Sequence, residues 1–322
     1  MKPVESFVLN DGAIIPSRGL GTHQVDPKAY PHSSLKTSVL AALKAGCRHI
    51  DTSLRYDNGN NEREVGEAIR ESRIPREEIY VVTKLENVFH APEDVEVGMD
   101  LSLRNLGVDY VPYAYKKTVD FGTQRDAQGR PLVDVELSRA FDVTWKVMEA
   151  LVDNGKARSI SNFSSPKVRR LLQTARIKPA VHQIECHPHW PQKGLVQLCQ
   201  SSGIHVTAFG PLGCAPIPSM IGRTTGPGPL KDETIATLAK KYTRTPAQLI
   251  LCFSLCRGVS VIPKSNSPAR IAENWDCIFE LAEEDFAVLD VLVGAHGERG
   301  VRNLESATYL GFDNYNEERE EP

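Results

Sequence analysis

The sequence predicts a single α/β domain of the (β/α)8, or TIM barrel, class, preceded by a β-hairpin. Short β-rich segments alternate with segments of helical period, which indicates a parallel sheet. Eight such strand candidates in a chain of 322 residues favour a closed barrel over an open sheet. No G-x-G-x-x-G motif follows the first strand, which argues against an open dinucleotide-binding sheet.

The elements follow from local patterns. Residues 7–9 and 13–15 flank Asn10-Asp11-Gly12, and Asp-Gly is a strong hairpin-turn signal. The strand candidates are residues 19–22, 49–52, 79–84, 108–115, 157–160, 180–185, 205–209 and 259–262. The helical candidates are residues 62–73, 92–106, a helix beginning near Pro166, and residues 194–201, 232–241, 246–256 and 268–277.

No linker divides the chain, so we expect one domain over residues 1–322, with the hairpin in residues 1–16. Two longer insertions, residues 118–136 and 213–230, are rich in Gly, Pro and polar residues, and we expect both to lie over one end of the barrel. Residues 314–322 form an acidic tail that we expect to be mobile.

The composition indicates a soluble protein of a reducing compartment. Apolar residues make up 41% and the formal charge is −3, which predicts no nucleic-acid or membrane partner. The seven cysteines include no C-x-x-C pair, and we interpret Cys252 and Cys256 as core residues and not as metal ligands. The N-terminus lacks a secretory signal pattern. We therefore expect a cytoplasmic monomer without a metal.

Polar and aromatic residues gather at the predicted strand ends, where barrels of this class carry their function. Each has an ordinary explanation taken alone, since an Asp after a strand caps helices and a Lys is usually solvated. Because all of these residues converge on one mouth of the predicted barrel, we favour a functional role for them. The set is Asp51, Tyr56, Lys84, Ser161, Asn162, Gln183, Glu185, Phe209, Gly210, Lys264 and Ser265.

Asp51, Tyr56 and Lys84 together suggest proton transfer. A free tyrosine has a pKa near 10, and a neighbouring ammonium lowers it. A carboxylate beside the lysine would keep that ammonium charged and oriented. Tyr56 could then protonate a carbonyl oxygen while a cofactor supplies hydride, which no side chain can do.

At these positions the sequence resembles the aldo-keto reductase family. The likeness runs from about residue 7 to about residue 292. It is carried by Gly19-Leu20-Gly21-Thr22, Arg48-His49-Ile50-Asp51-Thr52, Asn61-Glu62-x-Glu64-Val65-Gly66, Thr83-Lys84-Leu85, Ser161-Asn162-Phe163, Gln183-x-Glu185-x-His187-Pro188, Gly210-Pro211-Leu212-Gly213, Ile262-Pro263-Lys264-Ser265 and Arg270-Ile271-Ala272-Glu273-Asn274.

The resemblance implies NADPH-dependent reduction of an aldehyde or ketone, with NADP(H) lying across the barrel mouth. Asp51, Tyr56 and Lys84 match catalytic positions, with Tyr56 as the proton donor. Ser161, Asn162 and Gln183 match the residues that hold the nicotinamide carboxamide, and Phe209 replaces a stacking tyrosine. Lys264, Ser265, Arg270, Glu273 and Asn274 match the adenosine and 2′-phosphate site. Thr22, Asp51, Gly210 and Leu212 are further predicted cofactor contacts.

The fourth strand departs from the family, which has a catalytic histidine at its end. Counting without a gap puts Lys116 in the strand and Lys117 at the histidine position. A gap of about seven residues instead aligns Pro112 with the loop proline after that histidine. We favour the gap, because a proline inside a central strand loses a ladder hydrogen bond.

Strand five and the substrate rim depart as well. Ser161 follows Ile160 directly, so this strand is two residues shorter than in the family. A deletion of an even number of residues keeps each side chain on the same face of the sheet. His23 stands where a tryptophan is common and Glu86 where an aromatic residue is common, which suggests a more polar substrate site. Residues 113–118 resemble members from fungal secondary-metabolite biosynthesis.

Three hypotheses follow. The first is an active NADPH-dependent carbonyl reductase. The second is an NADP-binding protein of the same fold that is impaired or inactive because it lacks the histidine strand. The third is a truncated product, either natural or the result of a misread exon boundary, that folds poorly.

Overall fold

The computed structural model describes residues 1–24, 34–111, 113–116, 140–155, 159–161, 163–213 and 228–292. Its centre is an eight-stranded sheet in which every neighbouring pair of strands is parallel, and the strands follow one another in chain order. The strands are β3 (Leu20–Gly21), β4 (His49–Asp51), β5 (Tyr80–Leu85), β6 (Tyr113–Lys116), β7 (Ser159–Ser161), β8 (Val181–Glu185), β9 (His205–Phe209) and β10 (Val259–Ile262). The predicted α/β class with parallel strands is confirmed.

The chain segments at the two ends of this series, β3 and β10, lie beside each other. The Gly19 amide donates to the Val261 carbonyl at 2.8 Å, and the Val261 amide donates to the Ser17 carbonyl at 2.9 Å. An isolated parallel bridge joins Arg18 and Val261. Glycine is required at this approach, because a Cβ on Gly21 would lie 2.8 Å from the Ile262 carbonyl oxygen.

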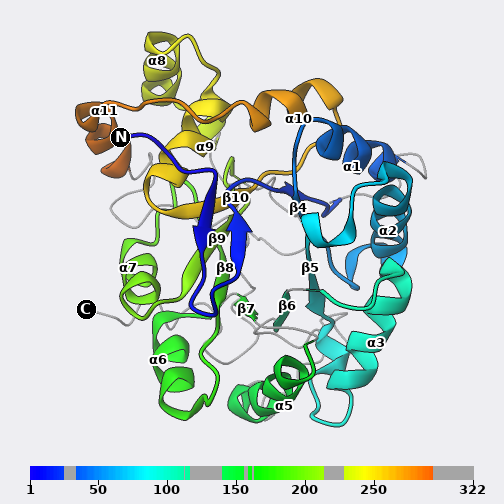
Figure 1. The fold of residues 1–322 in the computed structure, drawn as a ribbon. Helices are drawn as coiled ribbons and strands as arrows, with labels where there is room; N and C mark the ends of the chain where they lie inside the picture. The colour runs from blue at the N-terminus through cyan, green and yellow to red at the C-terminus, as the bar shows by residue number, and fades with distance from the viewer. Residues whose placement is uncertain are drawn as a thin grey trace, which may run out of the picture.

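Helices surround the strands (Figure 1). They are α1 (Ser34–Lys44), α2 (Asn60–Ser72), α3 (Val95–Leu106), α5 (Phe141–Asp153), α6 (Ser165–Thr174), α7 (Lys193–Ser201), α8 (Glu233–Lys241), α9 (Pro246–Cys256), α10 (Pro268–Trp275) and α11 (Glu283–Asp290). The predicted helices are all present. The sequence analysis missed α1, α5 and α11, although α1 buries Leu35, Val39 and Leu43 at the four-residue spacing of one helix face.

Capping explains why α9 begins and ends as predicted. Thr245 accepts a hydrogen bond from the Gln248 amide, while the Gln248 side chain accepts one from the Thr245 amide. Pro246 occupies the first turn, where its missing N–H costs nothing. Cys252 is buried in this helix and Cys256 is partly buried, in keeping with their predicted place in the core.

The N-terminal hairpin has the predicted form, with β1 (Ser6–Val8) antiparallel to β2 (Ile14–Pro16). Leu9 and Ile15 pack against Tyr80 at the start of β5 and Val181 at the start of β8. The hairpin therefore covers the amino-terminal end of the sheet, opposite the strand ends that carry the predicted site. Figure 1 shows it in dark blue, across the strands.

The fourth strand corrects the favoured alignment. Residues Tyr113–Lys116 follow Pro112 and form β6, which pairs with β5 from Val82↔Tyr113 to Leu85↔Lys116. The physical reason is that β5 presents an open row of backbone donors and acceptors, and the β-prone Tyr-Ala-Tyr segment satisfies it. The alignment to the family without a gap, which places Lys116 in the strand, agrees with this register.

Among the described residues β7 has three residues and meets β8 through Ile160↔His182 and Ser161↔Gln183, and the shortening of strands four and five stays a prediction. Residues 118–136, residues 214–227 of the second insertion, and the acidic tail lie outside the described residues. Within the described part of the chain, no helix has the length and apolar character needed to cross a membrane.

Candidate active site

A buried ion pair lies at the carboxyl ends of β4 and β5. Lys84 Nζ is 2.5 Å from Asp51 Oδ1 and donates to the Thr52 carbonyl at 2.9 Å. The Gln183 side-chain amide of β8 donates to the other oxygen, Asp51 Oδ2, at 2.7 Å. Asp51, Lys84 and Gln183 are each no more than 3% exposed. Both carboxylate oxygens are thus engaged, one by a cation and one by an amide.

Tyr56 lies against this pair. Lys84 Nζ is 5.1 Å from the centroid of the Tyr56 ring, and Tyr56 also interacts with it by a hydrogen bond. The loop places the ring by turning sharply straight after it, since Asp57 and Asn58 both have φ near +50°. The His23 ring also packs against the Tyr56 ring, with centroids 4.7 Å apart. The structure therefore brings the three predicted catalytic residues together.

The electrostatics of Lys84 favour its charged form. Burial alone would lower the pKa of this ammonium, but the charges of Asp51 and Tyr56 and their hydrogen bonds outweigh it, so the pKa of Lys84 is raised. An ammonium held charged beside a phenol stabilises the phenolate. This arrangement suits a tyrosine that gives up a proton.

Two residues of the rim were not recognised as partners from the sequence. Arg55 precedes Tyr56, and its Nη1 lies 2.7 Å from Glu86 Oε1, two residues beyond Lys84. The sequence indicates only that Glu86 replaces an aromatic residue, and it assigns no role to Arg55. Their opposite charges at two neighbouring strand ends were the available signal.

The predicted phosphate-binding residues gather before and at the start of α10. The Arg270 guanidinium donates to Ser265 Oγ at 3.4 Å, and the Ser267 hydroxyl caps the helix by accepting from the Arg270 amide. The pKa of the half-buried Lys264 is lowered by burial and by the charge of Arg270. Two cations, hydroxyls and a helix N-terminus form a site of the kind that binds phosphate.

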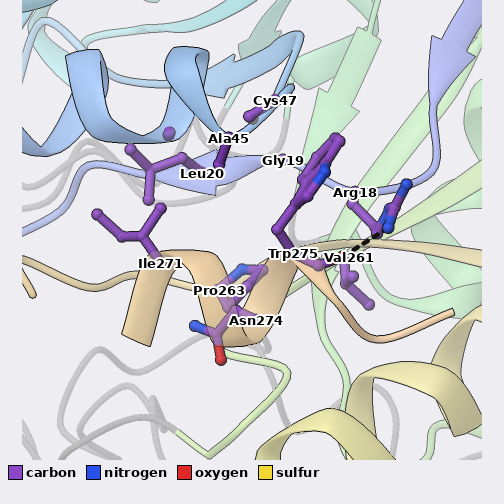
Figure 2. A pocket seen from close by; sticks show the side chains of 11 residues that line it. Arg18, Gly19, Leu20, Ala45, Cys47, Val261, Pro263, Ile271, Asn274 and Trp275 are labelled. Carbon is purple, nitrogen blue, oxygen red and sulfur yellow. Dashed lines mark hydrogen bonds between the residues drawn. The ribbon is translucent and has the colours of Figure 1, made fainter. Parts of the chain in front are cut away.

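Two residues of α10, Glu273 and Asn274, were predicted to contact adenosine, and each also has other neighbours in the protein. Glu273 accepts a hydrogen bond from Thr245 Oγ1 at 2.8 Å. Asn274 lines a cavity of about 20 Å³, which has room for about one water molecule and none for an adenine ring. Figure 2 shows this cavity with the Arg18 guanidinium against the Trp275 ring, 4.0 Å from its centroid.

The remaining predicted cofactor residues are placed as follows. Thr22 is buried; its amide donates to the Asp51 carbonyl, and its hydroxyl has no hydrogen-bond partner among the described residues. Phe209 ends β9 half-buried, Gly210 has φ of +54°, and Leu212 packs partly into the core. Ser161 ends β7, while Asn162 lies outside the described residues. No cluster of three metal-binding side chains occurs in the described ranges.

Comparison with known proteins identifies one family. The profile of the aldo/keto reductase family matches residues 19–293. The chain is 38% identical over 320 residues to the aldehyde reductase YPR1 of Saccharomyces cerevisiae, covering 94% of this chain and 96% of the relative. It is 37% identical to glycerol 2-dehydrogenase (NADP(+)) of Hypocrea jecorina, covering 91% and 93%. It is 37% identical to aldo-keto reductase family 1 member A1 of Rattus norvegicus, covering 89% of each chain.

The fold, the Asp–Lys–Tyr group and these matches define an oxidoreductase that acts on carbonyl or alcohol groups. The chain belongs to the aldo/keto reductase family.

Proposed function

We propose that this protein reduces an aldehyde or ketone to an alcohol with NADPH, and that Tyr56 donates the proton. The observation that carries the proposal is the buried Lys84–Asp51 pair held against the Tyr56 ring. Two relatives, named as an aldehyde reductase and as an NADP(+) glycerol 2-dehydrogenase, act on the same pair of functional groups.

In this reaction each side chain has a distinct task. Tyr56 gives its phenolic proton to the substrate oxygen, and the Lys84 ammonium stabilises the phenolate that remains. Asp51 keeps Lys84 charged and fixed in place. Gln183 holds Asp51 from the other side, so the carboxylate does not rotate away. The bound cofactor supplies the hydride that reaches the carbonyl carbon.

The residues present fit NADP(H). Burial and the nearby charge of Arg270 disfavour the charged form of Lys264, and a 2′-phosphate would offset both effects. The buried Thr22 hydroxyl, which has no hydrogen-bond partner among the described residues, follows Gly21, whose amide donates to the Pro263 carbonyl next to Lys264. The other proposed contacts to the cofactor are Ser161, Asn162, Phe209, Gly210, Leu212, Glu273 and Asn274. Asp51 acts both in catalysis and as a proposed cofactor contact.

The proposal includes a closed (β/α)8 barrel as a single domain, supported by the hydrogen bonds between the segments at β3 and β10. It also includes a cytoplasmic monomer that acts on a small carbonyl compound. A role in secondary metabolism stays a prediction from the residues around β6.

Two measurements on the purified protein test the proposal. Quenching of tryptophan fluorescence by NADPH, reported by Trp145, Trp190 and Trp275, measures cofactor binding. Loss of NADPH absorbance with a panel of aldehydes measures turnover. We expect both signals. Quenching without turnover favours the alternative, an NADP-binding protein that is inactive. That alternative follows from the lack of the family's histidine in the fourth strand. An Arg270→Met variant should weaken NADPH binding about ten-fold while changing NADH binding little.

A further inference from the structure

Two cysteines share one face of helix α9, away from the site at the strand ends. Cys252 and Cys256 are four residues apart, a spacing that places their side chains next to each other on a helix. Of the six cysteines that the structure describes, five are buried and Cys256 is partly exposed. The pair therefore joins a thiol that solvent can reach to one that it cannot.

The two thiols interact with each other, and each also has a carbonyl partner. The Cys252 thiol donates to the Phe279 carbonyl at 3.3 Å, and the Cys256 thiol donates to the Met1 carbonyl at 3.8 Å. A hydrogen bond also connects the two sulfur atoms. Because a thiol has one proton, Cys252 can turn its S–H from the Phe279 carbonyl to the Cys256 sulfur when Cys256 is ionised.

The hydrogen bond between the sulfur atoms makes the two cysteines unequal. It lowers the pKa of Cys256, against the effect of burial, and it raises the pKa of Cys252, as burial also does. The thiolate is the nucleophilic form of cysteine, so the accessible member of the pair is also the more reactive one. Thiolate character, access to solvent and a second cysteine beside it are the features of a redox-sensitive thiol.

The end of the helix provides the freedom that a bond between the two sulfur atoms needs. Cβ atoms four residues apart on a helix lie about 5–6 Å from each other, whereas a disulfide needs about 3.5–4.5 Å. Cys256 is the last residue of α9, and Gly258 follows with φ of +73°. Only the last turn has to loosen. A disulfide formed in this way is strained, and strained disulfides are the readily reduced, regulatory ones.

We propose that Cys256 and Cys252 form a reversible oxidation site for hydrogen peroxide. The Cys256 thiolate attacks one peroxide oxygen, the O–O bond breaks and hydroxide leaves, so that the sulfur is oxidised to a sulfenic acid and the peroxide is reduced. The Cys252 sulfur then attacks the sulfenic sulfur, and the Cys252 proton leaves with the hydroxyl group as water. The first step also removes the thiolate that held the Cys252 proton, which makes the second step easier. The site needs no reductase activity and stands apart from the proposed function.

Peptide mass spectrometry of the folded protein tests the proposal. Trypsin cleaves after Arg244 and Arg257, so a single peptide, residues 245–257, carries Cys252 and Cys256 and no other cysteine. After brief treatment with hydrogen peroxide, this peptide should lose the mass of two hydrogen atoms and regain it with dithiothreitol. Cys256 should react at least about ten-fold faster than the five buried cysteines.

Two variants separate the roles of the pair, and a third is the control. In Cys252→Ser the sulfenic acid has no partner, so Cys256 should proceed to sulfinic and sulfonic acids that dithiothreitol does not reverse. In Cys256→Ser, Cys252 should stay reduced because it is buried. Cys277 is also buried and lies close enough to Cys252 for their charges to interact, but it has no part in the reaction. Cys277→Ser should therefore form the disulfide as the wild type does.

The wild-type measurement is decisive by itself, because it does not depend on how any variant folds. The inference fails when the peptide of residues 245–257 stays reduced while added glutathione is oxidised, since an activated thiol reacts at least as fast as a free one. It also fails when the disulfide forms only in urea, because the reaction then requires unfolding, and when Cys277→Ser prevents it.

Discussion

The pairing of β8 with β9 differs sharply from that of β6 with β7. β8 and β9 match over their full length, from Val181↔His205 to Glu185↔Phe209. β6 and β7 meet only at Tyr115↔Ser159 and Lys116↔Ile160 in the described residues. On its other side β6 is paired with β5 along all four residues. Among the described residues, the short pairing thus lies beyond β4 and β5, the strands whose carboxyl ends hold the Lys84–Asp51 pair.

The largest expected effect tests whether catalysis resides in the well-paired region. Tyr56→Phe should lower kcat/KM for an aldehyde by about 10²- to 10⁴-fold, because the phenolic proton is gone while the ring stays. NADPH binding, measured by fluorescence, should be unchanged. Tyr110→Phe is the control, since Tyr110 is 39% exposed and its ring contacts Arg76. Full activity in Tyr56→Phe would refute the assigned proton donor.

The second prediction concerns the stability of the same region. Lys84→Met leaves the Asp51 carboxylate buried without its cation and should lower the free energy of unfolding by about 3–5 kcal/mol. Lys193→Met breaks a surface pair with Asp290 and should cost no more than about 1 kcal/mol. Urea denaturation measures both. Equal losses would mean that the buried pair has no special structural role.

Acid should weaken the well-paired strands through two buried histidines. Burial lowers the pKa of His49 on β4 to about 4 and that of His182 on β8 to about 3. His182 accepts from the Phe163 amide through Nε2, which fixes its proton on Nδ1. In the unfolded chain both histidines titrate near 6.5, so below that pH the unfolded state binds protons that the folded state does not.

Stability should therefore be full above about pH 6.5 and fall as the pH drops toward 4 and then 3. The slope is about 1.4 kcal/mol per pH unit for each histidine. Urea denaturation at a series of pH values measures it, and His182→Asn should give a shallower dependence. A stability that stays flat from pH 7 to 4 contradicts the prediction.

The smallest effect distinguishes the two strand pairs directly. Backbone amides of residues 113–116 and 159–161 should exchange with deuterium at least about ten-fold faster than those of residues 181–185 and 205–209. The reason is that β6 and β7 pair at two positions in the described part of the chain, whereas β8 and β9 pair at five. Mass spectrometry of protease fragments measures it. Uniform protection across all four strands would show that the short pairing is not a weak point.

Much of this arrangement was predictable from the sequence. Asp51, Tyr56 and Lys84 could be found because each lies at or just after the end of a β-rich segment, and parallel strands bring their carboxyl ends together. The hairpin and α9 could be found because an Asp-Gly turn and a capping box are local signals. These features depend on residues close in sequence or on a general rule of the fold.

The rest depended on partners distant in the chain. The position of β6 after Pro112 is decided by the open edge of β5, which no local pattern reports. Gln183 is predicted to hold a carboxamide, which stays a prediction, and no local pattern indicated that its amide donates to Asp51. The contact between Arg55 and Glu86 depends on how two loops approach each other. Side-chain pairing across strands is a property of register, and the register becomes known only with the assembled sheet.

The position of Asp51 also has a consequence for how activity appears in time. Its carboxylate joins Lys84 on the neighbouring strand to Gln183, which is 132 residues away along the chain. Contacts of such long sequence separation form late, because closing a long loop has a large entropic cost. During refolding from urea, turnover should therefore return only with the last phase of compaction, after helical circular dichroism has recovered. The recovery of enzymatic activity then reports when the sheet has fully formed.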